Sequence, residues 1–161
     1  MFVANDKKGF GLVEVLVGTA LLSVVLGGLI VLFSNFTRTA SENVREVKAA
    51  FLLQEGAEVV RLWRDQGWSN ISGLTTSQTY YPIFSTGRWA TSSVPVLVDG
   101  IFERRIVVAD TFRDINDDIV ESSTTNDPNT KKITVSVGWA AGGGATSTKS
   151  VVFYLTNLFS R

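Results

Sequence analysis

Asp114, Asn116 and Asp118 have the spacing of metal ligands, because Asp-x-Asn-x-Asp matches the first three ligand positions of an EF-hand calcium loop. The continuation does not match, since Ile119 replaces the obligatory glycine and Thr125 stands where a bidentate glutamate is needed. A solvated loop between two strands is the alternative interpretation of this acidic segment. We favour the loop over the calcium site, and we expect no cofactor.

The residues that most enzyme mechanisms need are missing, because the 161-residue chain contains no cysteine and no histidine. These absences remove thiolate nucleophiles, disulfides, the commonest general base and the commonest transition-metal ligand. No nucleophile with a neighbouring base is recognisable among the remaining Asp, Glu, Ser and Tyr residues. The sequence therefore predicts a protein that is not an enzyme.

The charge of the chain does not indicate a partner, because 15 Lys and Arg residues balance 15 Asp and Glu residues. A neutral chain has no overall field that favours nucleic acid or an anionic surface. Arg88, Arg104 and Arg105 could form a basic patch for DNA, but surface solubility explains three scattered arginines better. We therefore predict no binding of nucleic acid.

Glu14 is the only charged residue in the apolar run from Phe10 to Phe33. At about 1.5 Å per residue this run forms roughly 36 Å of helix, enough to cross a hydrocarbon core about 30 Å thick. A carboxylate within such a span costs about 3 kcal/mol unless it is paired or reaches the interface. A signal anchor whose carboxylate reaches the cytoplasmic surface is one explanation, and a functional role for Glu14 is the other.

Lys7 and Lys8 precede the apolar run, and basic residues beside a membrane span are held in the cytoplasm. This rule predicts a single-pass membrane protein with its N-terminus inside and everything after Phe33 outside. No small-residue cleavage site such as A-x-A follows Phe33. We therefore expect the apolar run to remain in the mature protein.

Residues Lys7–Leu16, KKGFGLVEVL, resemble the processing motif of type IV prepilins and pseudopilins, K-G-F-x-L-x-E-x-L/V in its common form. The resemblance implies that a prepilin peptidase cuts after Gly9 and methylates the new N-terminal Phe10. It also implies that Glu14 meets the terminal amine of a neighbouring subunit in the filament. Cleavage after Gly9 places an amine four residues from Glu14 on the same helical face, and methylation keeps the charge of that amine.

This resemblance predicts a structural subunit, a minor pilin, of a type IV pilus or related filament. The expected partners are prepilin peptidase, other pilin subunits, an inner-membrane assembly platform and the lipid bilayer. After assembly the chain is expected in a filament at the cell surface or across the periplasm. A pseudopilin of a type II secretion or DNA-uptake system is the closest alternative, and a single-pass membrane-anchored binding module or adhesin is an alternative of a different class.

The helical pattern continues beyond the apolar run, and one helix is predicted over residues 11–65. Apolar residues recur at spacings mostly of three and four: Phe33, Phe36, Ala40, Val44, Val47, Phe51, Val60 and Trp63. We expect this stripe, with Phe51 in it, to pack on a β-sheet. Many major pilins carry a proline near the position of Val31, which this chain lacks, and Gly27 with Gly28 is its nearest weak point.

Strand patterns follow in the C-terminal part of the chain, at Val94–Val98, Ile101–Val108, Ile133–Trp139 and Ser150–Thr156. The dipeptide Asp99-Gly100 predicts a tight hairpin between the first two. Alternating apolar residues in the third predict one buried face, which we expect to lie on the helix. Residues 67–93 are interpreted as a connection with one short strand, and residues 110–129 as a loop with a turn at 127–129.

The predicted fold class is α+β, with a long N-terminal transmembrane and amphipathic helix packed on a small antiparallel β-sheet, as in type IV pilins. Four segments are predicted along the chain. They are a leader peptide at 1–9, a transmembrane and filament-core helix at 10–33, the outer half of the same helix at 34–66, and a β-rich globular domain at 67–161.

Overall fold

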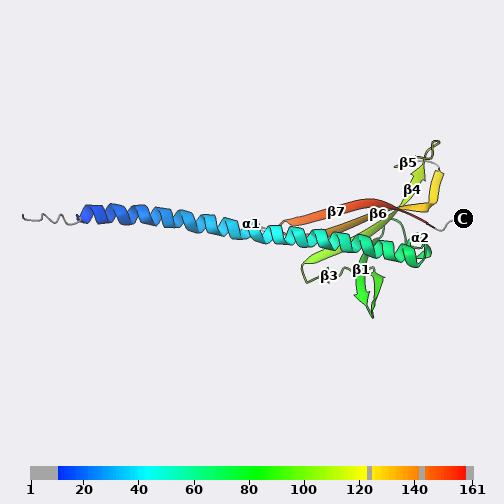
Figure 1. Cartoon of the computed structure of the whole chain (residues 1–161), viewed down its shortest axis with the longest axis horizontal. Helices are drawn as coiled ribbons and strands as arrows, with labels where there is room; N and C mark the ends of the chain where they lie inside the picture. The colour runs from blue at the N-terminus through cyan, green and yellow to red at the C-terminus, as the bar shows by residue number, and fades with distance from the viewer. Residues whose placement is uncertain (1–10, 123–124, 142–143, 159–161) are drawn as a thin grey trace, which may run out of the picture. The chain divides into compact units, whose positions relative to one another are not determined.

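The computed structural model describes residues 11–122, 125–141 and 144–158. Its elements in chain order are α1 (Leu12–Gln66), α2 (Ser69–Ser72), β1 (Thr79–Ser85), β2 (Arg88–Ser92), β3 (Leu97–Val98), β4 (Phe102–Arg113), β5 (Ile119–Val120), β6 (Thr125–Ala140) and β7 (Thr146–Thr156) (Figure 1). The chain divides into two compact units, Met1–Val44 and Arg45–Arg161. The predicted single helix is confirmed, since α1 runs without interruption to Gln66.

The seven strands of the second unit form one antiparallel sheet with the order β2-β1-β4-β6-β7. The short strands β3 and β5 pair with β4 beside this path. The long strands β4, β6 and β7 make up most of the sheet, and the C-terminal part of α1 lies against it (Figure 1). This helix on an antiparallel sheet is the α+β, pilin-like arrangement that the sequence predicts.

The core of the second unit lies between α1 and one face of the sheet. The predicted alternation in β6 is confirmed, because every second residue from Ile133 to Trp139 is almost completely buried. The other buried core residues include Leu52, Val59, Val60 and Trp63 of α1 and Phe102, Ile106 and Val108 of β4. Removing this apolar surface from water is the main stabilising contribution to the unit.

The predicted apolar stripe of α1 combines two sides of the helix, because its members Val60 and Trp63 are buried against the sheet whereas Val47 and Phe51 are not. Phe51 is 66% exposed and Val47 is 57% exposed, so the expectation that Phe51 contacts the sheet is wrong. The sheet instead contacts the side that carries the small residues Ala49, Gly56 and Ala57. Small residues let the helix backbone approach the strands closely, whereas a phenylalanine at the same positions would hold the two layers apart.

Two segments that were interpreted as connections contain strands. Residues 67–93 form the short helix α2 and the hairpin of β1 and β2, not a connection with one strand. Most of the predicted loop at 110–129 belongs to β4, β5 and the first part of β6. These stretches are rich in polar residues and lack the apolar alternation that indicates a strand with one buried face.

The hairpin predicted at Asp99-Gly100 is confirmed. Both residues have positive φ, 52° and 68°, and the N–H of Ile101 donates to the carbonyl of Val98 at 3.2 Å. Positive φ at two consecutive positions is the conformation that an Asp-Gly turn between strands adopts. The strand before the turn is shorter than predicted, because β3 contains only Leu97 and Val98.

The predicted turn at residues 127–129 lies inside β6. In the pairing of β4 with β6, Asp110 lies opposite Lys131, but the next residue, Thr111, lies opposite Asp127. Residues 128–130 therefore have no partner in β4. Such an irregularity tolerates Pro128, which cannot donate a ladder hydrogen bond. Asp127 stabilises the bend by accepting the N–H of Asn129 at 2.9 Å.

Candidate functional site

The first described turn of α1 presents Glu14 to solvent. The carbonyl of Gly11 accepts the N–H groups of Glu14 at 3.0 Å and Val15 at 3.2 Å, so the helix hydrogen bonding begins at Gly11. Glu14 is exposed and lies in this first turn, where a carboxylate interacts favourably with the positive end of the helix dipole. The predicted processing residues Lys7, Lys8, Gly9 and Phe10 lie outside the described residues.

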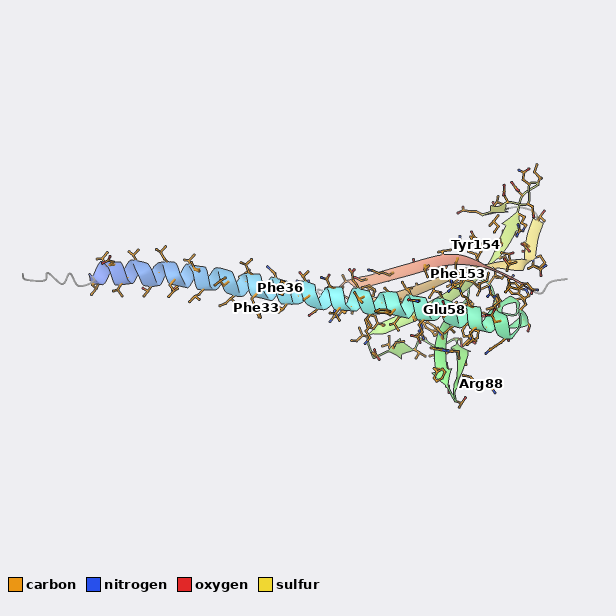
Figure 2. All side chains as sticks on the ribbon, viewed as in Figure 1. Phe33, Phe36, Glu58, Arg88, Phe153 and Tyr154 are labelled. Carbon is orange, nitrogen blue, oxygen red and sulfur yellow. The ribbon has the colours of Figure 1, made fainter. Side chains whose placement is uncertain are left out.

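The first unit has no apolar core of its own, because none of its described residues is buried. Each of its large apolar side chains from Leu12 to Phe36 is at least half exposed, as Figure 2 shows for Phe33 and Phe36. The helix contains an 18-residue window with a mean hydropathy of 2.6 that is 0% buried, long and apolar enough to cross a membrane. Apolar surface of this extent needs a lipid or protein partner.

The polar side chains in the apolar part of α1 form hydrogen bonds within the helix. Thr19 donates to the carbonyl of Leu16 at 2.9 Å, and Ser23 donates to the carbonyl of Thr19 at 2.8 Å. These groups therefore need no external partner in an apolar environment. Glu14 differs from them, because it is the only charged residue between positions 11 and 37.

The glycines of the first unit leave open space on the helix surface. A β-carbon at Gly18, Gly27 or Gly28 would meet no heavy atom within 4 Å. Nothing in the single chain therefore requires glycine at these positions. Small residues on a membrane helix permit the close approach of another helix.

In the second unit, α1 carries apolar residues on the side away from the sheet. Val47 and Phe51 are more than half exposed and Leu62 is 42% exposed. They lie opposite the buried residues Ala49 and Val60, because each residue of an α-helix is turned by about 100° from the one before it. We call Val47, Phe51 and Leu62 the outer stripe.

Arg104 is a buried arginine between α1 and the hairpin of β1 and β2, so its interpretation as a surface residue is wrong. Its side chain is 4% exposed, and its Nη1 lies 3.0 Å from Oε2 of Glu55 on α1. Its guanidinium lies 5.1 Å from the ring centroid of Trp89 in β2, a cation–π distance. The alternation of residues along β4 could have predicted this burial. Arg104 lies between Phe102 and Ile106, which are buried and share its face of the strand.

The calcium candidate forms a local hydrogen-bonded loop. Oδ1 of Asp114 accepts the backbone N–H groups of Asn116 at 2.8 Å and Asp118 at 2.9 Å. The hydrogen bonds from Asp118 and Asn116 lower the pKa of Asp114. No group of three or more His, Cys, Asp or Glu side chains that could hold a metal ion occurs in the described part of the chain. These contacts favour a structural role for Asp114.

The sequence-predicted site residues fall in different parts of the chain. Glu14 belongs to the first unit, the Asp114 loop belongs to the second, and the basic leader residues lie outside the described residues. A cavity of about 440 Å³ lies near the end of β4 and is lined by residues that include Asp110, Lys132 and Tyr154. The described residues therefore show no catalytic constellation, and the exposed apolar surfaces of α1 are the functional candidates.

Comparison with known proteins identifies one feature. Residues 4–30 match the family model of the prokaryotic N-terminal methylation motif, a range that contains Lys7, Lys8, Gly9, Phe10 and Glu14. No curated protein and no solved structure matches the chain. The motif is structural and is not known as enzymatic. The chain thus carries, at residues 4–30, a prokaryotic N-terminal methylation motif, which is the type IV prepilin-type signal.

Proposed function

We propose that this chain is a structural subunit, and a minor one, of a type IV pilus or related filament. The observation that carries the proposal is the methylation motif on a helix whose apolar residues are exposed in the single chain. Such a helix requires an apolar environment, which the bilayer supplies before assembly and neighbouring helices supply afterwards.

Processing is the first step of the proposed function. A prepilin peptidase cleaves after Gly9 and methylates the amine of Phe10. The basic residues Lys7 and Lys8 hold the leader in the cytoplasm, so the chain enters the membrane with its N-terminus inside and its sheet outside. The assembly platform then transfers the chain from the membrane to a filament at the cell surface or across the periplasm.

Glu14 has the central role in the proposed assembly. Its carboxylate lies in the first turn of α1 and is the only charge before Arg38 in the described part of the helix. The methylated amine of Phe10 in a neighbouring subunit supplies the opposite charge. In a packed apolar filament core, pairing removes the cost of two isolated charges, and the attraction between them is weakly screened.

The outer stripe of the second unit extends the proposed contact surface. Val47, Phe51 and Leu62 face away from the sheet and present apolar area that the second unit does not cover. Neighbouring copies of α1, or other pilin subunits, would bury this area in the filament. This contact would give a role to Val47 and Phe51, which the sequence pattern assigned to the sheet.

The proposed organisation keeps four segments. Residues 1–9 are the leader that the peptidase removes, and residues 10–33 are the membrane and filament-core helix. Residues 34–66 are the outer half of that helix, and residues 67–161 are the globular domain. Cleavage after Gly9 separates the first segment from the other three.

The proposal is tested by shearing filaments from cells that express the chain and comparing the sheared fraction with the membrane fraction. We expect the processed chain in both fractions, with full-length precursor confined to the membrane. A chain that is processed and remains entirely in the membrane would contradict the proposed filament role. A membrane protein without a prepilin signal serves as the control for contamination of the sheared fraction.

A further inference from the structure

A second cavity, of about 280 Å³, is lined by residues from the C-terminal end of α1, from α2 and from β2. Its lining residues include Trp63, Gln66, Asn70, Trp89 and Thr91, and all of them belong to the second unit. The cavity is open to solvent, because Gln66, Asn70 and Thr91 are exposed. None of its lining residues belongs to the outer stripe.

Trp89 is held in place beside this cavity by two neighbouring side chains. The guanidinium of Arg104 lies over the Trp89 ring, 5.1 Å from its centroid. The ring of Phe84 meets it edge-on, with 5.3 Å between the centroids and an interplanar angle of 63°. Arg104 engages one face of the ring, and Trp89 remains partly exposed. An aromatic ring that is already fixed loses little conformational freedom when a ligand stacks on it.

Two side-chain amides and a hydroxyl bring hydrogen-bonding groups to the same cavity. Nδ2 of Asn70 donates to the carbonyl of Trp63 at 3.1 Å, which fixes the orientation of the amide. The carbonyl oxygen and the second N–H of this amide remain able to bind another group. The side chains of Gln66 and Thr91 have no hydrogen-bond partner among the described residues. The cavity thus offers both donors and acceptors.

The charge and the size of the cavity restrict its ligand. Among the described residues, no Asp, Glu, Lys or Arg lines it, whereas Asp110 and Lys132 line the cavity near the end of β4. A charged ligand would therefore meet no opposite charge in its lining. Pockets for drug-sized ligands have volumes of about 300 to 1,000 Å³. A cavity just below this range accommodates a single ring rather than an extended molecule.

A neutral sugar ring has the chemistry that this lining would recognise. One face of a pyranose consists largely of C–H groups, which are attracted to the partly negative face of an indole ring. The hydroxyl groups around the ring both donate and accept hydrogen bonds. A side-chain amide also presents a donor and an acceptor side by side, so it can pair with two neighbouring hydroxyls. Trp89 and the two amides therefore match the two kinds of surface that a sugar carries.

An apolar peptide side chain is the competing occupant, and the polar lining argues against it. Such a side chain could also pack on Trp89. It would, however, cover the amides of Gln66 and Asn70 without supplying hydrogen-bond partners. Removing polar groups from water without such partners costs free energy.

We propose that this cavity, the Trp89 pocket, binds one neutral hexopyranose unit. The sugar ring stacks on Trp89, and its hydroxyls form hydrogen bonds with Gln66, Asn70 and Thr91. The unit belongs either to a free sugar or to a glycan chain, since both present the same ring. The pocket uses residues outside the outer stripe, so it is independent of the proposed filament role.

Tryptophan fluorescence of the full chain tests the pocket, because Trp89 is one of only four tryptophans. The chain is solubilised in a detergent without a sugar headgroup and titrated with glucose, galactose, mannose and N-acetylglucosamine. We expect a saturable change with at least one of these sugars, with a Kd in the millimolar range. Sorbitol, which has hydroxyls but no ring, should give no such change. The trisaccharides maltotriose and chitotriose distinguish the two sources, because tighter binding than the monosaccharide indicates a glycan chain and equal binding indicates a single sugar.

Gln66→Ala tests the lining without removing the fluorescent side chain. Gln66 is exposed, so the variant should fold as the parent does. Loss of a neutral hydrogen bond should weaken sugar binding by about two- to tenfold. Gln54→Ala is the matched control, because Gln54 is an exposed glutamine of the same helix that does not line the cavity. The control should bind sugar with the affinity of the parent.

Four results would overturn the inference. They are no saturable change with any of the sugars, an equal change with sorbitol, equal weakening by Gln54→Ala and Gln66→Ala, and tighter binding of N-acetyl-leucine amide than of every sugar. The last result would assign the pocket to an apolar peptide side chain.

Discussion

Gly56 of α1 lies directly above Val135 of β6, and a β-carbon added at Gly56 would be 2.7 Å from Cγ1 of Val135. Real β-carbons do not approach other atoms so closely, so a side chain at this position must displace the helix or the strand. The pair therefore sets the distance between the helix and the sheet in the second unit.

The Gly56 contact gives the first prediction. Gly56→Ala should destabilise the second unit by about 1 to 3 kcal/mol, because overpacking outweighs the gain in helix propensity. Gly138→Ala is the matched control, since its β-carbon would meet the flexible end of Arg105 at 3.2 Å, Thr148 Oγ1 at 3.4 Å and the carbonyl oxygen of Ser147 at an ordinary 3.8 Å. Tryptophan fluorescence of the detergent-solubilised full chain measures unfolding. Equal stability of the two variants would contradict the proposed close approach.

The second prediction separates the buried side of α1 from the outer stripe. Trp139 is 3% exposed, so Trp139→Ala should cost about 3 to 5 kcal/mol of stability. Phe51→Ala should leave stability within about 0.5 kcal/mol of the parent, because surface substitutions of this kind have small effects. Phe51→Ala should instead reduce the fraction of processed chain in filaments. A large loss of stability in Phe51→Ala would show that the outer stripe is buried within the single chain.

The third prediction concerns acid sensitivity at Asp127. Burial raises the pKa of Asp127, but the hydrogen bonds from the Arg113 side chain and the Asn129 N–H outweigh burial and hold the pKa below its ordinary value of 3.8. A carboxylate with a lowered folded-state pKa stabilises the fold above the ordinary value, and this stability is lost as the pH falls through the folded pKa. Asp127→Asn should therefore lower the free energy of unfolding at pH 7. The variant should also lose less of this free energy than the parent when the pH is lowered.

Urea denaturation of the parent and the variant at pH 7 and at pH 3 measures this effect. Asp65→Asn is the control, because Asp65 has an exposed side chain and should keep the acid response of the parent. An Asp127→Asn variant with the same acid response as the parent would show that the Arg113 and Asp127 pair does not contribute.

The sequence predicted the α1 helix, the buried face of β6 and the turn at Asp99 because each depends on a local pattern. It placed Val60 and Trp63 against the sheet correctly, but it did not predict that Phe51 faces away from the sheet. Both sides carry apolar residues, and the choice depends on how closely Gly56 and Val135 approach, which is a tertiary property. The hairpin of β1 and β2 was missed for a similar reason, since Trp89 packs there on Arg104 from a distant strand.

In the candidate site, too, the sequence predicted what depends on a local pattern and missed what depends on tertiary contacts. A short motif with fixed spacing predicts roles for Glu14 and for the residues at the cleavage site, and the matched methylation motif covers these positions. The ion pair of Arg104 with Glu55 was not identified, because its two residues are distant in sequence and meet only after the sheet forms. Surface position could not be predicted from residue type alone for Phe51 or for Arg104.

The fourth prediction concerns Glu14 in assembly. Glu14→Ala and Glu14→Leu make the helix more apolar, so membrane insertion and cleavage should continue. Entry into filaments should fall, because the amine of Phe10 loses its partner in the packed core. Glu14→Gln should also assemble poorly, since an amide is similar in size but cannot neutralise the amine. The measurement is the ratio of processed chain in sheared filaments to processed chain in the membrane. A ratio equal to that of the parent in all three variants would show that Glu14 has no role in assembly.

The intact mass of the membrane-extracted chain tests the central claim most directly. We predict a species that begins at Phe10 and carries one N-terminal methyl group. Gly9→Val should retain the whole leader, because the peptidase requires a residue without a side chain at the cleavage position. A parent chain that keeps residues 1–9 without methylation, or a Gly9→Val variant with the normal mature mass, would contradict the claim that this chain is processed as a prepilin.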